Sequence, residues 1–271
     1  MATFFGRFRQ LVDTGMVRVE RDYHGLSAEL YDEIACHTDD IDFYVGLAGK
    51  CGSSVLELGC GTGRVLIPLA RAGFEVWGID NSEPMLKILS RKLEAEPKAV
   101  AQRVHTVISD MCDFAVNRRF ALALMPYFTF AHLTDTNSRK ATLRNVWLHL
   151  AAGGKFAAEI SLRGDRTTPS AHPVLSSVSH NKVEGSLTLV LSQQQRAHDG
   201  TIVLNLLHVF VDRHGSANLS AVSAQEAETN ARELHELLTE SGFKHIQFFG
   251  DFNRSQLEPD AKRTVVIATK A

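Results

Sequence analysis

The sequence predicts an α/β fold in which a mostly parallel sheet is covered by helices on both faces and is interrupted by an antiparallel insertion. Short apolar runs typical of strands alternate with helical patterns through the first 160 residues. These strand-like runs are apolar throughout, as expected for parallel strands buried on both faces. After about Pro173 strands follow one another directly, which indicates antiparallel pairing. These three observations define the expected fold class.

Each element in the first part of the chain has a local signal. Apolar residues three and four positions apart predict helices over 27–36 and 41–47. A helix over 65–72 is expected to end at Gly73, because glycine readily adopts the conformation that closes helices. Ser82 is expected to cap the next helix, with a proline tolerated in its first turn. The other expected elements are strands at 54–58, 75–80, 104–109, 120–125 and 155–160, and a helix at 136–150 closed by Gly153 and Gly154.

The chain divides into three expected parts. Residues 1–50 are expected to form an N-terminal helical cap, and residues 51–161 and 226–271 the α/β core. Residues 162–225 are expected to form the antiparallel insertion, which begins with a surface connection over 162–173 and carries a hairpin signal at Asp199-Gly200. Because α/β features resume afterwards, the insertion is not expected to be an independent domain. The resumed elements are a helix at 230–241 and strands at 245–249 and 264–269.

Composition and charge argue against several classes of protein. The 271 residues are 44% hydrophobic and 22% charged, with a net charge of −2, which is typical of a soluble globular chain. No run of Lys or Arg exceeds two residues, so no nucleic-acid partner is expected. The longest apolar stretch, Phe120–Leu133, is interrupted by Pro126 and is too short to span a bilayer. We therefore expect a soluble, cytoplasmic protein without a membrane partner.

The cysteines indicate neither a disulfide framework nor a metal site. They are not spaced as C-x-x-C and lack the spacing of metal ligands. We expect reduced thiols and no bound metal, as is usual in the cytosol. The four cysteines are Cys36, Cys51, Cys60 and Cys112.

The segment VLELGCGTGRVLIPLARAGFEVWGID, which ends at Asp80, carries the strongest functional signal. A strand is followed by Gly59, Gly61 and Gly63 and then by a helix, an order that lets the backbone approach a ligand closely. Asp80 lies 21 residues after Gly59 at the end of the next strand, where a carboxylate can accept both hydroxyls of a ribose. A nicotinamide-dependent dehydrogenase is disfavoured, because the dinucleotide fingerprint is G-x-G-x-x-G and Arg64 occupies its sixth position.

This segment resembles the first two motifs of class I S-adenosylmethionine-dependent methyltransferases. The likeness continues through ISDMCDF, the usual third motif, and through LMPYFTFAHL, which resembles a segment of the small-molecule members. It also includes LHLAAGGKF and the C-terminal ELLTESGF, and it spans Tyr23 to Thr269. The resemblance implies a Rossmann-like, seven-stranded sheet whose last strand is antiparallel, and S-adenosyl-L-methionine as the cofactor.

The resemblance also assigns cofactor contacts to the matching positions. The acid and glycines of the first motif would hold the methionine part, Asp80 the ribose, and Asp110 the adenine amino group. Met125 would lie where main-chain carbonyls face the sulfonium methyl, and the N-terminal segment would fold over the cofactor. The implied cofactor-binding residues are Tyr23, Tyr31, Glu57, Gly59, Gly61, Gly63, Asp80, Asn81, Met85, Asp110, Met111 and Met125.

The cofactor implies transfer of a methyl group to the N or O atom of a small metabolite. Because the sulfonium already activates the methyl, the protein mainly aligns the acceptor and excludes water. An amine must arrive neutral and a hydroxyl needs a base, so we expect His132, Tyr127 and Glu159 to act in catalysis. His132 ranks first because it follows the fourth strand, and Phe128 is placed to stack on a flat substrate. His172 and His208 are further candidate bases.

Other functions stay open at this point. A methyltransferase of protein or RNA is disfavoured for two reasons. The net charge is close to zero, and the insertion is expected to cover an enclosed site that suits a small substrate. An enzyme that uses the same cofactor for other chemistry, such as cyclisation of its aminobutyl arm, would share the motifs. So would a catalytically silent cofactor-binding protein. The expected partner is a small-molecule methyl acceptor, and the expected assembly is a monomer or homodimer.

Overall fold

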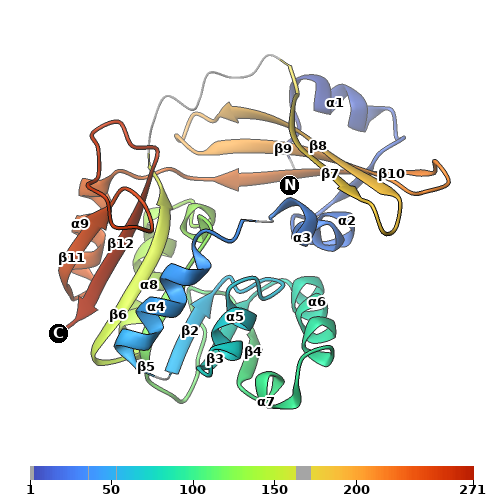
Figure 1. The fold of residues 1–271 in the computed structure, drawn as a ribbon. Helices are drawn as coiled ribbons and strands as arrows, with labels where there is room; N and C mark the ends of the chain where they lie inside the picture. Colours follow the sequence, from blue (N-terminus) through green and yellow to red (C-terminus); the bar gives the residue numbers. More distant parts are fainter. Residues whose placement is uncertain (1–2, 36, 53, 163–171) are drawn as a thin grey trace. The chain divides into compact units, whose positions relative to one another are not determined.

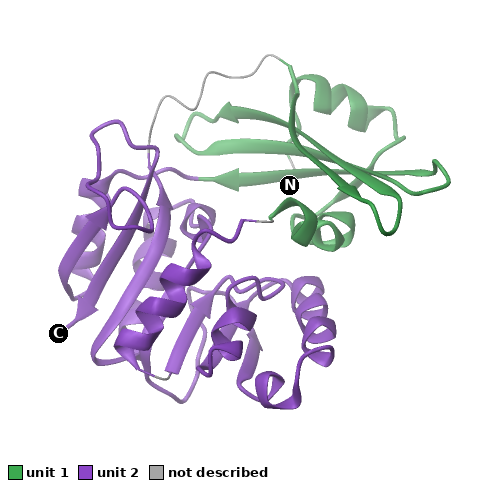
Figure 2. Ribbon diagram, viewed as in Figure 1, with its two compact units in different colours: residues 1–36, 165–226 green, residues 37–164, 227–271 purple. Residues whose placement is uncertain are grey.

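The computed structural model describes residues 3–35, 37–52, 54–162 and 172–271, which form two compact units (Figure 2). Unit 1 contains residues 1–36 and 165–226, and unit 2 contains residues 37–164 and 227–271. Cys36 and most of the connection expected over 162–173 lie outside the described residues.

Unit 2 is built around a seven-stranded sheet (Figure 1). The strand order is β11-β12-β6-β5-β2-β3-β4. Neighbours from β6 to β4 pair in parallel, whereas β12, the last strand of the chain, is antiparallel to both β6 and β11. The expected fold class is therefore confirmed. The strands are β2 Ser54–Leu58, β3 Glu75–Asp80, β4 Val104–Ile108, β5 Phe120–Met125, β6 Leu150–Ser161, β11 Phe243–Phe249 and β12 Arg263–Lys270.

Helices cover both faces of this sheet, and each face has its own apolar core. Because side chains alternate along a strand, Leu122 and Leu124 of β5 pack in the core shared with α4, α5 and α6. Ala123 and Met125 pack in the core shared with α8 and α9. In the described residues no helix is long and apolar enough to cross a membrane. The helices of unit 2 are α4 Ile41–Cys51, α5 Leu66–Arg71, α6 Glu83–Glu94, α7 Lys98–Ala101, α8 Thr136–His149 and α9 Ala231–Glu240.

Polar side chains cap the N-termini of three of these helices. Ser82 Oγ accepts a hydrogen bond from Met85 N (3.3 Å) at the start of α6, which confirms the predicted cap. Asp135 Oδ1 accepts from Ser138 N (3.0 Å) at the start of α8. Asn230 caps α9 in the same way, because its side chain accepts a hydrogen bond from Glu233 N. Each cap satisfies a backbone N–H that has no partner within its helix.

Unit 1 combines a five-stranded sheet with short helices (Figure 1). The strand order is β1-β10-β9-β8-β7, in which β1 pairs in parallel with β10 and the other pairs are antiparallel. The predicted hairpin is confirmed, since Arg196 and Ile202 pair on either side of Asp199-Gly200. That the insertion covers the substrate site stays a prediction. The elements are α1 Gly6–Asp13, β1 Arg18–Glu20, α2 Gly25–Glu29, α3 Tyr31–Ile34, β7 Val174–Asn181, β8 Ser186–Arg196, β9 Ile202–Val211 and β10 Ala217–Glu226.

The N-terminal region differs from the helical cap expected over residues 1–50. Residues 1–36 belong to unit 1, because β1 extends its sheet and Phe8 packs against Leu207. The rest of the expected cap belongs to unit 2, because α4 packs in the core of that unit. The helix expected over 27–36 forms instead as the short helices α2 and α3. Partners distant in sequence decide this division, and a local pattern does not report them.

Candidate cofactor site

The glycine loop between β2 and α5 lies at the carboxyl end of the parallel strands. Gly59 N and Cys60 N both donate to Ile79 O, at 2.8 and 3.2 Å, and so tie the loop to β3. Gly63 N donates to Cys60 O (2.9 Å) and closes a tight turn. The loop is thereby held at the edge where ligands bind in open α/β sheets.

The three glycines of this loop adopt conformations that other residues disfavour. Their φ angles are +66° at Gly59, +51° at Gly61 and +83° at Gly63. A Cβ on Gly59 would lie 2.5 Å from Cγ2 of Thr129, and a Cβ on Gly63 would lie 2.5 Å from Cδ1 of Leu89. The motif therefore forms a tightly packed loop whose positions favour glycine, and its backbone is open to close approach by a ligand.

Asp80 is held in a fixed orientation at the end of β3. Its Oδ2 accepts a hydrogen bond from Gly61 N and its Oδ1 accepts one from Ser82 N, both at 2.8 Å. Burial raises the pKa of this carboxyl, whereas these N–H groups and the charge of His132 lower it. Each oxygen has lone pairs for a further donor. The carboxylate can therefore accept the two hydroxyls of a ribose.

Glu57, on β2, is a buried acid at the same edge, with a relative exposure of 3%. Among the described residues its Oε2 has no hydrogen-bond partner. Burial raises the pKa of its carboxyl well above the ordinary value, Arg64 lowers it, and Asp40 and Asp80 raise it further. A buried acceptor without a donor is costly, and the ammonium of the methionine part of the cofactor would supply that donor. The residues present therefore fit S-adenosylmethionine.

The loop that follows β4 lies beside Asp80. Ser109 N donates to the main-chain oxygen of Asp80 (3.0 Å), which joins the ends of β4 and β3. The next residue, Asp110, is exposed, and its Oδ1 accepts a hydrogen bond from Cys112 N (2.8 Å). Asp110 is thus oriented by its own loop, near the carboxylate expected to hold the ribose. Its contact with adenine stays a prediction.

The apolar residues expected around the cofactor differ in exposure. Met85 is buried, and its Cε would lie 3.2 Å from a Cβ on Gly61. Met111 is half-buried and Asn81 is exposed. Met125, at the end of β5, is fully buried. The structure therefore brings Met85 to the glycine loop, and the roles of the other three stay predictions.

The loop after β5 begins with two residues in left-handed conformations. Tyr127 has a φ of +52° and Phe128 a φ of +57°. Such conformations cost about 1–3 kcal/mol each for non-glycine residues, so surrounding contacts must hold them. Thr129 Oγ1 donates to Pro126 O (2.7 Å) within this turn. The short helix η1, Thr129–His132, follows.

Two of the catalytic candidates of unit 2, His132 and Glu159, lie in different surroundings. His132, in η1, interacts electrostatically with Asp80. Glu159, in β6, is 3% exposed, and its Oε1 accepts a hydrogen bond from Arg263 Nη1 (3.2 Å). Burial raises the pKa of Glu159 to about 7, although Arg263 lowers it. The structure thus places His132 within electrostatic reach of the Asp80 carboxylate, and Glu159 is a buried acid with a nearly neutral pKa.

Four other candidates from the sequence belong to unit 1. The rings of Tyr23 and Tyr31 stand edge to face, with their centroids 5.9 Å apart. His208 is buried in β9, where burial lowers its pKa and Glu20 raises it. His172 is exposed. Their contributions to the cofactor or acceptor site stay predictions.

Sequence reasoning missed two arginines of unit 2. Arg64 donates to both carboxylate oxygens of Asp40, at 2.6 Å each. Its one sequence signal is that it directly follows the glycine motif. Arg263 pairs with Glu159, and these residues are 104 positions apart. The signal that could have found this pair is the antiparallel pairing of β12 with β6, which brings the two strands side by side.

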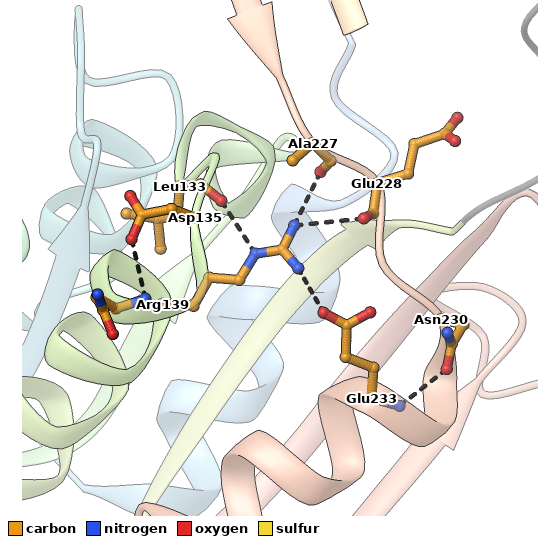
Figure 3. A network of polar contacts seen from close by, with 8 residues as sticks. Leu133, Asp135, Arg139, Ala227, Glu228, Asn230 and Glu233 are labelled. Atoms are coloured by element: carbon orange, nitrogen blue, oxygen red, sulfur yellow. Dashed lines mark hydrogen bonds and ion pairs between the residues drawn. The ribbon is translucent and has the colours of Figure 1, made fainter. Parts of the chain in front are cut away.

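A buried arginine joins the loop after β5 to the segment that precedes α9 (Figure 3). Arg139 Nε donates to Leu133 O (3.0 Å), and its Nη1 donates to Glu233 Oε1 (2.8 Å). Its Nη2 donates to Ala227 O and Glu228 O, at 3.3 Å each. Arg139 is 4% exposed, so these bonds are formed away from water. The network fixes the residue that follows η1.

Replacing Arg139 with methionine is expected to lower the free energy of unfolding by about 2 kcal/mol. Removing one partner of a buried pair costs more than this, but the Glu233 side chain is 35% exposed and can be solvated. Calorimetry should show a thermal midpoint lower by roughly 4–8 °C. Arg232→Met is the matched control, because the exposed pair of Arg232 with Glu236 contributes little. Equal midpoints for the two variants would contradict the assigned role of Arg139.

Known proteins resemble this chain in sequence and in fold. Residues 55–154 match the model of the methyltransferase domain family. Over 103 residues the chain is 35% identical to a cypemycin N-terminal methyltransferase of a Streptomyces species, covering 38% of this chain and 40% of that protein. Over 188 residues it is 28% identical to a dTDP-3-amino-3,6-dideoxy-alpha-D-glucopyranose N,N-dimethyltransferase of Streptomyces fradiae. This match covers 63% of this chain and 71% of that protein. The solved CcbJ methyltransferase from Streptomyces caelestis has a TM-score of 0.75 at 23% identity, over 93% of this chain and 99% of that chain.

The sheet order, the glycine loop and the acid after β3 define a class I methyltransferase fold. Residues 55–154 thus match the methyltransferase domain family, the fold is that of the solved methyltransferase, and the site at the glycine loop fits S-adenosylmethionine as the cofactor. The chain spans 40% and 58% of the length of two of the curated relatives that it matches.

Proposed function

We propose that the chain transfers the methyl group of S-adenosylmethionine to the nitrogen atom of a small-molecule amine. One observation carries this proposal: the glycine loop, Asp80 and the buried Glu57 form a site that fits the methyl donor. The names of two relatives support nitrogen as the acceptor atom, since one is an N-terminal methyltransferase and the other an N,N-dimethyltransferase. The second of these is named for an amino-sugar nucleotide.

Glu159 is the base in this proposal. An amine is mostly protonated near neutral pH and must lose a proton before its nitrogen can attack the methyl. Glu159 follows Ala158, which pairs with Met125 at the end of β5. It therefore lies at the edge of the sheet that carries the loop after β5. A carboxyl with a pKa of about 7 can accept the proton at neutral and higher pH. His132 and Tyr127 orient the acceptor.

The acceptor class is tested with methyl-labelled S-adenosylmethionine and three compounds. These are an amino-sugar nucleotide, the corresponding nucleotide with hydroxyls only, and a short peptide with a free N-terminus. Mass spectrometry should find the label on the nitrogen of the amino-sugar nucleotide. Label on the hydroxyl compound or on the peptide alone would contradict a small-molecule amine as acceptor. Conversion of the cofactor to a cyclised product without label transfer would do the same.

A further inference from the structure

Glu159 and Arg263 form an ion pair between two neighbouring strands of unit 2. β6 and β12 pair in antiparallel, with Ser161 opposite Arg263 and Glu159 opposite Val265. Side chains two positions apart on a strand lie on the same face, so Arg263 is the diagonal neighbour of Glu159. Arg263 Nη1 donates a hydrogen bond to Glu159 Oε1 over 3.2 Å. The ion pair therefore follows from the register of the two strands.

The two side chains of this pair differ in exposure. The Glu159 side chain is 4% exposed, whereas that of Arg263 is 43% exposed. A buried carboxylate has almost no water to solvate its charge, but a half-exposed guanidinium stays solvated without a partner. Glu159 therefore depends on the pair more than Arg263 does. Because such a pair contributes little to stability, removing Arg263 should change the carboxylate more than the fold.

The loop between β11 and β12, residues 250–262, also contacts the guanidinium. The ring centroid of Phe252 lies 5.6 Å from the central carbon of Arg263, a distance at which a cation is attracted to an aromatic face. The same ring contacts Phe43 and Tyr44 of α4, with centroids 5.6 and 6.0 Å apart. A planar guanidinium can stack on a ring and donate a hydrogen bond at the same time. Phe252 thus holds Arg263 while Arg263 holds Glu159.

Other charged groups around Glu159 oppose the effect of Arg263. The groups that interact with its carboxyl are Arg263 of β12, Asp39 and Asp40 before α4, and Tyr44 of α4. Burial and the two aspartates disfavour the ionised carboxylate, whereas the charge and the hydrogen bond of Arg263 favour it. A carboxylate must be ionised to accept a proton, so this contact bears directly on a base at this position.

We propose that Arg263 is a positioning residue for Glu159, whose carboxylate it holds by the direct bond to Oε1 while Phe252 holds the guanidinium. This bond engages one carboxylate oxygen, and the other, Oε2, is the one that receives the proton of the acceptor amine. The inference rests on the proposed function, in which Glu159 is the base.

The first test is a ¹³C NMR titration of labelled glutamate side chains in wild-type protein and in Arg263→Gln. The signal of Glu159 is the one that Glu159→Gln removes. Its midpoint should rise from about 7 to about 8, because the ionised carboxylate loses a cation in direct contact. Such a contact lowers the pKa of a carboxyl by about 1–3 pH units, and the partial exposure of Arg263 favours the lower end of that range.

The second test is the dependence of kcat/KM on pH for the same two proteins. With a midpoint of about 8, about one tenth of Glu159 is ionised at pH 7, compared with about half in the wild type, so the rate should fall about fivefold. The deficit should disappear near pH 9, which a damaged fold would not reproduce. The ratio of the two rates at each pH removes the protonation of the acceptor amine itself. Arg263→Lys, which keeps the charge, should recover most of the wild-type profile.

Arg254→Gln is the matched control. Arg254 lies on the same loop, and its guanidinium carbon is 5.7 Å from the ring centroid of Phe249. The variant therefore removes the same charge and a similar ring contact, and it should keep the wild-type midpoint and rate profile.

Folding of the variants is checked by thermal unfolding. If Arg263→Gln does not fold, Phe252→Leu takes its place. It should raise the Glu159 midpoint by a smaller amount, because the guanidinium loses the ring that holds it.

The two measurements separate a failure of this inference from a failure of the proposed function. If Glu159→Gln loses turnover but a folded Arg263→Gln keeps the wild-type midpoint or rate profile, the role of Arg263 is overturned. An Arg263→Lys variant that behaves like Arg263→Gln would overturn it as well. Wild-type turnover in Glu159→Gln would instead overturn the proposed base, and the NMR midpoint would still decide whether Arg263 controls the carboxylate.

Discussion

Replacing Asp80 with alanine is expected to lower the affinity for S-adenosylmethionine about 30- to 150-fold. The carboxylate is held by Gly61 N and Ser82 N, so it is already oriented before the ribose arrives. Losing hydrogen bonds to a charged group of this kind typically costs about 2–3 kcal/mol, which corresponds to that change in affinity. Isothermal titration calorimetry of wild-type and variant protein measures it directly.

Glu83→Ala is the matched control for this variant. Glu83 lies three residues beyond Asp80, and its carboxylate pairs with Lys87 on the surface of α6. Glu83→Ala changes the net charge by the same amount as Asp80→Ala does, but it leaves the site untouched. The affinity for the cofactor should therefore stay within about twofold of the wild type. If Asp80→Ala bound the cofactor as tightly as Glu83→Ala does, the assignment of Asp80 to the ribose would be wrong.

Replacing Glu159 with glutamine is expected to lower turnover about 100-fold at neutral pH, in the range typical of a lost general base. In the wild type kcat/KM should rise as the pH increases through about 7, because Glu159 must be ionised to accept the proton. Glutamine cannot take up a proton, so this part of the rise should disappear in the variant. Profiles of rate against pH for both proteins measure the effect, and cofactor affinity should be unchanged.

The control removes a comparable pair elsewhere on the sheet. Glu75 accepts hydrogen bonds from both Nη atoms of Arg118 at the first residue of β3, at the edge of the sheet opposite the site. Glu75→Gln should keep the wild-type pH profile. A Glu159→Gln variant with wild-type turnover and the same profile would remove Glu159 from the reaction.

Local sequence signals were sufficient for much of the fold and for the positions of the glycine loop and Asp80 in the candidate cofactor site. The strands β2 to β5 coincide with apolar runs in the sequence, and Ser82 directly precedes the helix that it caps. The glycine loop and Asp80 were predictable for the same reason, since a turn, a helix and the next strand are consecutive in the chain. The hairpin at Asp199-Gly200 needed only its own turn residues.

Features that depend on distant partners were missed. The pairs of Arg64 with Asp40 and of Arg263 with Glu159 join residues 24 and 104 positions apart. The strand β1 exists because it pairs with β10, about 200 residues later, so residues 1–50 did not form one helical cap. Contacts of this kind follow from tertiary packing, and propensity alone does not report them.

The strand β6 is a smaller example of the same limit. It begins at Leu150 and not at the expected position 155, because Leu150 pairs with Phe120 before the register shifts. Gly153, expected to close the preceding helix, lies inside this strand with a φ of +73°. A glycine can mark either a helix end or an irregular strand, and here the pairing with β5 decided between them.

A crystal structure of the protein with S-adenosylhomocysteine tests the assignment of the cofactor site. We expect the nucleoside at the carboxyl ends of β2, β3 and β4, with both ribose hydroxyls within hydrogen-bond distance of the Asp80 carboxylate. We also expect the ammonium at Oε2 of Glu57, the buried oxygen that has no partner among the described residues. A nucleoside bound elsewhere, or an ammonium directed away from Glu57, would contradict the assignment of the glycine loop, Asp80 and Glu57 to the cofactor.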